Sequence, residues 1–334
     1  MFRSIDEKNQ NHIKEKNKIV KQNDNHKRII KPFKANKNHF ALIESYFMSF
    51  LLIYFIITTN IKVSSSLRIR KLIKLNEIQI KIFGNEEQYI LNPDFSSKPF
   101  EISVNGNPSI LDSENKVSNL GSGMNIITMK WDYKLNDCGT MFSDLTNLKE
   151  VDLSNLDGTE ITSMNYMFWD CANLESVNLT NLKTPSLIDM GGLFSGCNSL
   201  LSADLSYLNT SSVINMGSLF SECTSLKSVN LSNFDTSKVI SMSFLFYSCS
   251  SLISVDLSNF DTTSVTSIDY MFSECLSLTS IDLSKFKTDS LKLVFGLFFN
   301  CNNLRYLDIS NFDTSKATSL SYLFYGCQNL DILI

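Results

Sequence analysis

Residues Leu226–Cys249 read LKSVNLSNFDTSKVISMSFLFYSC, and residues Leu252–Cys275 read LISVDLSNFDTTSVTSIDYMFSEC. The two stretches belong to a series of copies with a 26-residue period, and each copy is marked by a phenylalanine: Phe142, Phe168, Phe194, Phe220, Phe246, Phe272, Phe298 and Phe324. In seven of the eight copies a cysteine follows three residues later: Cys171, Cys197, Cys223, Cys249, Cys275, Cys301 and Cys327. A fixed period in this range is the signature of stacked repeats, in which each unit is too small to bury a core alone.

The pattern within one copy predicts the local structure of the unit. Apolar and polar residues alternate from Val255 to Ser258, which predicts a short strand with one buried face. The stretch 267–275 has apolar residues at spacings of 3, 4 and 7, which predicts one face of a short helix. The fold class predicted for 137–334 is therefore α/β. It is a leucine-rich-repeat-like solenoid of strand, turn and short helix units, seven full and one partial, with the strands in one parallel sheet.

Two further features of the repeats have structural interpretations. The cysteine column is predicted to be a ladder of buried free thiols, because free cysteine packs as a small hydrophobe. Disulfides between adjacent copies stay open as the alternative. The Asp-Thr pairs after the strand are interpreted as ordinary turn residues: Asp235-Thr236, Asp261-Thr262 and Asp313-Thr314.

The chain before the repeats divides by composition. Residues 1–40 hold eleven Lys or Arg against four Asp or Glu, which predicts a basic disordered tail. The apolar segment 41–61 and a juxtamembrane linker, 62–75, follow it. Residues 76–136 contain alternating apolar runs separated by turn residues, which predicts a small β-rich module that caps the first repeat.

The segment 41–61 is interpreted as a transmembrane signal anchor or as the apolar region of a signal peptide. Its part Ser45–Ile61 has 17 residues and no charge, the short end of a transmembrane helix. Because the basic flank precedes it, the positive-inside rule predicts a single-pass membrane protein with a cytosolic tail and the repeats outside. Cleavage of a signal peptide is the alternative, and it would leave the repeats secreted or at the cell surface.

Stacking is expected to line up equivalent residues of successive copies in columns. One exposed column carries carboxylates and hydroxyls, and it is the candidate partner-binding column: Asp204, Asp256, Asp282, Asp308, Ser206, Ser258, Ser284 and Ser310. The alternative is that each Asp accepts hydrogen bonds from nearby hydroxyls or turn amides. The functional interpretation is a surface for Ca²⁺ or a cationic partner, but no Asp-rich loop with calcium spacing supports calcium in particular.

Two further sets of residues are candidates for surface function. Aromatic residues at one variable position are candidate partner anchors: Trp169, Tyr247, Phe299 and Tyr325. Edge packing is the structural alternative for them. Asn178, Asn209 and Asn230 stand in N-x-[ST] sequons, which are N-glycosylation acceptors only in a eukaryotic secretory route.

The residues needed for most site chemistry are missing from the repeats. All three histidines lie in the basic tail, at positions 12, 26 and 39, so Ser-His-Asp catalysis, Cys-His catalysis and histidine zinc sites are excluded beyond it. The whole chain has a net charge of −4, whereas residues 1–40 are basic, so the body is acidic. We therefore expect no enzyme activity, no cofactor, no metal and no nucleic-acid partner.

The motif of Leu226–Cys249 closely resembles the repeats of the BspA-like leucine-rich-repeat surface proteins, and the resemblance extends over about 137–334. It implies a leucine-rich-repeat fold, cell-surface display and adhesion, and it brings no site residues with it. The copies depart from the pattern at 183–185 (KTP) and at 291–295 (LKLVF). The first hypothesis is a surface protein that binds an extracellular protein or glycan. The alternatives are an intracellular scaffold and a structural coat that binds nothing specific.

Overall fold

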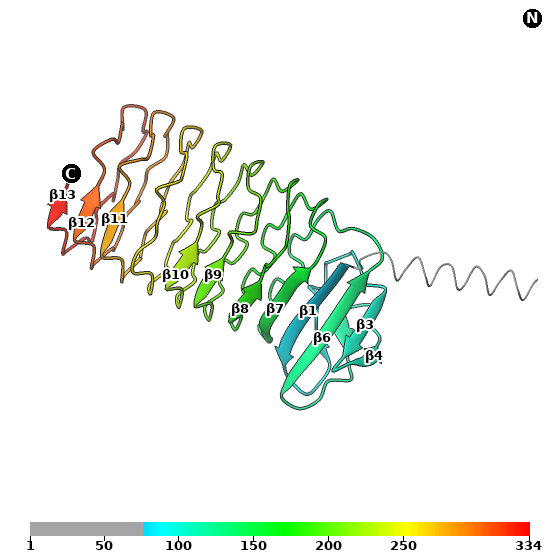
Figure 1. The fold of residues 1–334 in the computed structure, drawn as a ribbon. Coiled ribbons are helices and arrows are strands. Elements are labelled where there is room, and N and C mark those ends of the chain that lie inside the picture. Colours follow the sequence, from blue (N-terminus) through cyan, green and yellow to red (C-terminus); the bar gives the residue numbers. More distant parts are fainter. Residues whose placement is uncertain (1–75) are drawn as a thin grey trace, which may run out of the picture. The chain divides into compact units, whose positions relative to one another are not determined.

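The computed structural model describes residues 76–334 (Figure 1). These residues belong to one unit, Ile69–Ile334. The predictions of a basic tail at 1–40, an apolar segment at 41–61 and a linker at 62–75 lie outside the described residues. Figure 1 shows strands β7 to β13 following one another in chain order along the repeats.

The segment before the repeats forms an antiparallel sheet from the alternating apolar runs of the sequence. Its strands, in the order β4-β3-β6-β1, are β1 (Asn76–Phe83), β3 (Glu101–Val104), β4 (Asn107–Ser109) and β6 (Met124–Trp131). Ile78, Ile80 and Ile82 are fully buried, because side chains of a strand alternate between its two faces. A second sheet pairs β2 (Gln88–Tyr89) with β5 (Lys116–Val117).

This antiparallel sheet continues into the first repeats. β1 pairs with β6 on one side and with β7 (Leu148–Asn155) on the other, both antiparallel. β7 then pairs in parallel with β8 (Ser176–Asn178), with Val151 opposite Val177. The edge of the first repeat strand is therefore covered by β1, which satisfies backbone groups that would otherwise be unpaired.

The later repeat strands form separate short sheets. β9 (Ser202–Asp204) pairs with β10 (Ser228–Asn230), and β11 (Ser280–Asp282), β12 (Tyr306–Asp308) and β13 (Ile332–Leu333) form another sheet. The residues around Val255, predicted to be a strand, form none. The expectation of one parallel sheet through all copies is therefore wrong, because pairing of these three-residue segments is interrupted between copies.

The predicted short helix of each unit is also wrong, since no helix occurs in residues 76–334. The amides of Tyr270, Phe272 and Glu274 donate to carbonyls of the next copy, at distances of 2.7–3.0 Å. The amides of Met271 and Ser273 donate three residues back. In an α-helix each backbone amide donates to the carbonyl four residues earlier in the same segment. Because every second amide here donates to the next copy, this segment cannot be an α-helix.

The backbone in this part of each copy makes successive turns instead. Tyr270 and Glu274 have φ of 54° and 60°, in the left-handed region, and the equivalent residues of other copies share this conformation. The α/β solenoid of strand, turn and short helix units predicted from the sequence is thus contradicted by the structure. The 3, 4 and 7 spacing identified the buried side chains of Ile268, Met271 and Phe272 but assigned the wrong backbone to them.

Neighbouring copies are connected by a regular series of parallel bridges between residues 26 positions apart. The series runs Asp137, Ser163, Asp189, Asn215, Ser241, Ser267, Leu293 and Ser319. Because each bridge joins the same position of two copies, equivalent side chains lie side by side. This arrangement creates columns of equivalent side chains along the repeats.

The phenylalanine column is the centre of the core. Phe142, Phe168 and the five that follow to Phe298 are fully buried. Successive rings from Phe142 to Phe324 are stacked, with centroids 5.4–6.2 Å apart and interplanar angles of 4–11°. Each ring therefore contacts its two neighbours, and burial of every ring stabilises both adjoining copies.

The cysteine column contains free thiols, as the ladder interpretation predicted. Cys138 and six of the repeat cysteines are buried, and Cys327 is partly buried. Each repeat thiol donates to the carbonyl of the phenylalanine one copy back, as Cys249 does to Phe220 at 3.0 Å. Burial raises the pKa of Cys249 well above its ordinary value, so this thiol stays protonated and unreactive.

A column of threonines also joins the copies, at positions where the sequence suggested only turn residues. Its members are almost fully buried: Thr184, Thr210, Thr236, Thr262 and Thr288. The hydroxyl of Thr236 donates to the carbonyl of Asp261 at 2.9 Å and accepts from the amide of Asp261 at 2.8 Å. Thr236 and Thr262 begin turns, since their carbonyls accept from the amides of Val239 and Val265, as the sequence predicted. Their hydroxyls in addition bond across copies, which the turn interpretation did not include.

Among residues 76–334 no helix has the length and apolar character needed to span a bilayer. This finding contradicts the single-pass membrane location predicted for the chain. The segment behind that prediction, 41–61, lies outside the part of the chain that the structure describes.

Candidate functional site

The carboxylates of the aspartate column form local turns. Oδ1 of Asp256 accepts from the amide of Ser258 at 2.9 Å, and Oδ1 of Asp282 accepts from the amide of Ser284 at 2.8 Å. The same bond occurs in the copies of Asp204 and Asp308. Each of these carboxylates thus has one oxygen engaged in its own turn, which is the local bonding that the sequence left as the alternative.

The asparagines at the same position bond in the same way and also reach the previous copy. Asn178 accepts from the amide of Thr180 at 3.1 Å, and its Nδ2 donates to Asp152 at 3.1 Å. Asn230 donates likewise to Asp204 at 3.0 Å. Both asparagines are exposed, as is Asn209 of the third sequon.

These turns predict acid sensitivity. The hydroxyl and the amide of the serine two residues later lower the pKa of Asp204, Asp256 and Asp282 from the ordinary value of 3.8. A carboxyl with a lowered pKa in the folded state stabilises the fold above the unfolded pKa, and this contribution is lost as pH falls through the folded pKa. We expect the melting temperature to fall as pH is lowered below about 4.

The matched variant for this prediction replaces Asp204, Asp256 and Asp282 together by Asn. Asparagine at the equivalent positions 178 and 230 accepts the same turn bond and does not titrate. The triple variant should therefore keep its melting temperature near neutral pH and lose less of it in acid than the parent. An acid profile that is unchanged in this variant would contradict the assignment.

The four predicted aromatic anchors lie in two places. Trp169 is 44% exposed and contacts Tyr166. Tyr247, Phe299 and Tyr325 belong instead to a larger group of contacting rings, and Tyr325 is 60% exposed. We call this group the aromatic surface, and its members are Phe244, Tyr247, Tyr270, Phe295, Phe299, Tyr322 and Tyr325.

Four rings of the aromatic surface were missed from the sequence: Phe244, Tyr270, Phe295 and Tyr322. Three of them share the column two residues before the core phenylalanine, and the same column holds Tyr166. The signal was therefore present as a second set of aromatic residues with the 26-residue period. It was missed because the helix interpretation of 267–275 followed only the apolar positions Ile268, Met271, Phe272 and Cys275, and Tyr270 is not one of them.

Glycine in this column makes room for the ring of the previous copy. A Cβ on Gly192 would lie 2.4 Å from the ring of Tyr166, and one on Gly296 would lie 2.8 Å from the ring of Tyr270. Both glycines also have φ near 60°, a conformation that favours glycine. Where the next copy has glycine, the tyrosine ring therefore lies directly over its backbone.

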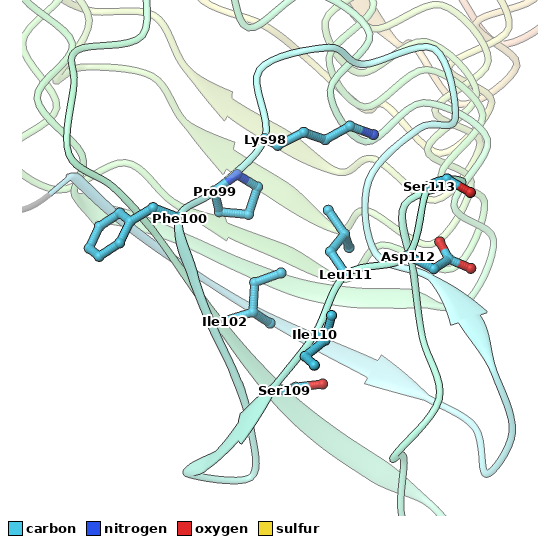
Figure 2. Close-up of a pocket in the computed structure, with 9 residues that line it drawn as sticks. All are labelled: Lys98, Pro99, Phe100, Ile102, Ser109, Ile110, Leu111, Asp112 and Ser113. Carbon is cyan, nitrogen blue, oxygen red and sulfur yellow. The ribbon is translucent and has the colours of Figure 1, made fainter.

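A pocket of about 530 Å³ lies in the segment before the repeats. Figure 2 shows Ile102, Ile110 and Leu111 gathered between two chain segments in this pocket. Its polar groups already have partners, since Asp112 accepts from the amides of Glu114 and Lys116, both at 2.8 Å. Lys98, at the other end, donates to Asn115. Among the described lining residues, both charged side chains thus have hydrogen-bond partners beside an apolar wall, and they point to no particular chemistry.

The family of the chain follows from its repeats. A family model described as "Mycoplasma protein of unknown function, DUF285" matches residues 136–230 and 218–333, which together make up more than half of the sequence. The chain belongs to this family. The match covers the copies with the phenylalanine and cysteine columns and supports a repeat-containing protein. The match does not confirm the resemblance of the sequence to the BspA-like leucine-rich-repeat proteins.

No curated protein and no solved structure matches the chain. Within residues 76–334, no three His, Cys, Asp or Glu side chains are placed to share a metal ion.

Proposed function

We propose that this DUF285 protein is a non-catalytic recognition protein whose repeats bind a protein partner through the aromatic surface. The supporting observation is that seven aromatic rings from successive copies contact one another and remain at least partly exposed. Tyrosine and other aromatic residues are enriched among the few interface residues that contribute most of the binding free energy. Tyrosine and phenylalanine also lose little side-chain entropy on binding, because each has only two rotatable side-chain bonds.

The arrangement of the rings favours a protein over a glycan. Six of the eight ring pairs in the aromatic surface are tilted or edge-on, including Phe295 with Tyr322 at 65°. A sugar chain stacks best on a row of parallel, uncovered ring faces. Rings at varied angles instead form an uneven apolar surface, which suits side chains of a protein partner.

The resemblance of the copies to BspA-like surface proteins supports adhesion as the use of this binding. The aspartate column is a weaker candidate for the contact, because Asp256 and Asp282 each have an oxygen engaged in a turn. The absence of catalysis is part of the proposal, since no histidine occurs after position 39.

The test measures binding of the purified full chain to immobilised solubilised matrix proteins and, separately, to a glycan array. We expect binding to the proteins, weakened at least about tenfold by Tyr270→Ala with Tyr325→Ala, because removal of interface hot spots commonly has effects of this size. Tyr207→Ala is the matched control, since Tyr207 is 44% exposed and lies outside the aromatic surface. Its binding should stay within about twofold of the parent.

Several outcomes would overturn the proposal. Binding to glycans alone would replace the protein partner by a sugar. Loss of binding in Asp256→Ala with Asp282→Ala, but not in the aromatic variant, would move the site to the aspartate column. If the parent chain bound neither the proteins nor the glycans, the hypothesis of a structural coat that binds nothing specific would be favoured instead.

A further inference from the structure

A groove of about 620 Å³ lies over the first copies, next to the loop that contains Asn92. Tyr166 and Trp169 line it together with serines of the next two copies, among them Ser195 and Ser221. The volume lies within the range of small-molecule and side-chain binding sites. The groove is separate from the aromatic surface, because none of the seven rings of that surface lines it.

The groove exists because aromatic and small residues alternate between copies at the same positions. The column of Tyr166 continues with Gly192 and Ser218, and the column of Trp169 continues with Ser195 and Ser221. Large side chains return in both columns only at Phe244 and Tyr247. Two copies with small residues therefore leave a space beside the Tyr166 and Trp169 rings.

Three carboxylates without a described positively charged partner line the groove. Asp94, Asp144 and Glu222 are exposed, and within residues 76–334 none of their side chains has a hydrogen-bond or ion-pair partner. None of the described residues that line the groove is Lys, Arg or His. Partial burial, with repulsion from the Asp170 carboxylate, raises the pKa of Asp144 from its ordinary value. A cation in the groove would relieve this repulsion.

The two aromatic rings provide a second attraction for a cation. Tyr166 and Trp169 are 43% and 44% exposed, and their rings meet edge to face with centroids 6.3 Å apart. Tryptophan has the strongest attraction of the aromatic side chains for an ammonium or guanidinium group over its face. Among the described residues, no group of three His, Cys, Asp or Glu is placed to hold a metal ion, which favours an organic cation.

We propose that this groove binds a Lys or Arg side chain of a peptide segment. Asp94, Asp144 and Glu222 attract the positive charge, and Trp169 and Tyr166 contact the cation and its aliphatic stem. The inference goes beyond the partner binding proposed above, because it concerns different residues and a ligand of defined charge. A finding that one of the two sites binds nothing would not affect the proposal for the other site.

The experiment titrates the full chain with fluorescently labelled hexa-arginine at low salt. We expect binding that weakens at least about tenfold in Trp169→Ala and in Asp144→Asn with Glu222→Gln, and that weakens as salt rises. Trp169→Phe should retain part of the affinity, since phenylalanine keeps a ring face. Melting temperatures of all variants confirm that they remain folded.

The matched control removes the same charge elsewhere. Asp235→Asn with Asp261→Asn keeps the turn bonds, because Asn209 at the equivalent position already makes one at 3.1 Å. This variant should bind hexa-arginine as the parent does. The proposal would be overturned if the groove variant and this control variant weakened hexa-arginine binding equally, or if Trp169→Ala bound as the parent does. Either result would indicate unspecific attraction to an acidic chain. Absence of any binding by the parent would also overturn it.

One further arm distinguishes two sources of the cation. Residues 1–40 of this chain are themselves basic, so the variant with Lys14, Lys16, Lys18 and Lys21 all replaced by Gln is titrated beside the parent. Tighter hexa-arginine binding in this variant would show that the chain's own segment competes for the groove. Unchanged binding would indicate a separate protein as the source.

Discussion

Phe246→Ala should lower the free energy of unfolding by about 3–5 kcal/mol, the usual cost of truncating a buried phenylalanine. Phe246 is fully buried, and its ring stacks on Phe220 and Phe272 with both centroid distances at 5.7 Å. The substitution removes contacts with both neighbouring copies and leaves a cavity between them. Because each copy is stabilised mainly by its neighbours, the loss should spread along the repeats. Urea unfolding of the full chain, followed by circular dichroism, measures the effect.

The control for this prediction is Phe244→Ala, two residues away. Phe244 is 37% exposed and belongs to the aromatic surface instead of the core column. Its truncation should cost about 1 kcal/mol, as expected for a partly exposed ring that contacts Tyr247 and Tyr270. Equal destabilisation by the two variants would show that the phenylalanine column is not the main source of stability.

Thr236→Val should lower the free energy of unfolding by about 2–3 kcal/mol. The two side chains have nearly the same shape, so the change removes the hydroxyl and little packing. The hydroxyl is the partner of both the amide and the carbonyl of Asp261, at 2.8 and 2.9 Å. A lost hydrogen bond costs about 1 kcal/mol, and more where a buried group is left unpaired. The same urea titration provides the measurement.

Two variants separate the hydroxyl from other effects at this position. Thr236→Ser keeps the hydroxyl and should cost about 1 kcal/mol, the value of the lost methyl group. Thr263→Val makes the same substitution at an exposed threonine whose hydroxyl bonds only to the Asp261 carboxylate. It should change stability by about 0.5 kcal/mol or less. If Thr263→Val proved as costly as Thr236→Val, the cross-copy bond would not be the cause.

The sequence was informative wherever side-chain burial alone sets the pattern. The alternation of Ile78, Ile80 and Ile82 predicted strand β1 and its buried face, since a strand presents every second residue to one side. The spacing of Phe246, Cys249 and Leu252 likewise identified residues that are buried in the structure. These patterns depend on which residues avoid water, and hydrophobicity is a property of each residue.

The backbone of the repeats could not be predicted from the same pattern. The spacing from Ile268 to Cys275 is compatible with a helix and also with successive turns whose third residues, Tyr270 and Glu274, have positive φ. Only the tertiary structure shows that the amides of Tyr270, Phe272 and Glu274 bond to the next copy. This choice depends on a neighbour 25 residues away, and periodicity within one unit carries no information about such a neighbour.

The candidate sites show the same division. The sequence pointed to Trp169, Tyr247, Phe299 and Tyr325, but it could not show that three of them join a surface of seven contacting rings while Trp169 lines a groove. Nor could it show that Asp256 has an oxygen engaged in its own turn, while the Asp144 carboxylate has no hydrogen-bond or ion-pair partner within residues 76–334.

By itself, the sequence determined the 26-residue period, the residues that face the core and the lack of histidine chemistry in the repeats, because these follow from residue type and spacing. The tertiary structure alone decided the backbone path of each unit, the cross-copy role of Thr236 and the grouping of exposed rings. These features depend on hydrogen bonds and contacts between copies, which form only when the repeats are packed together.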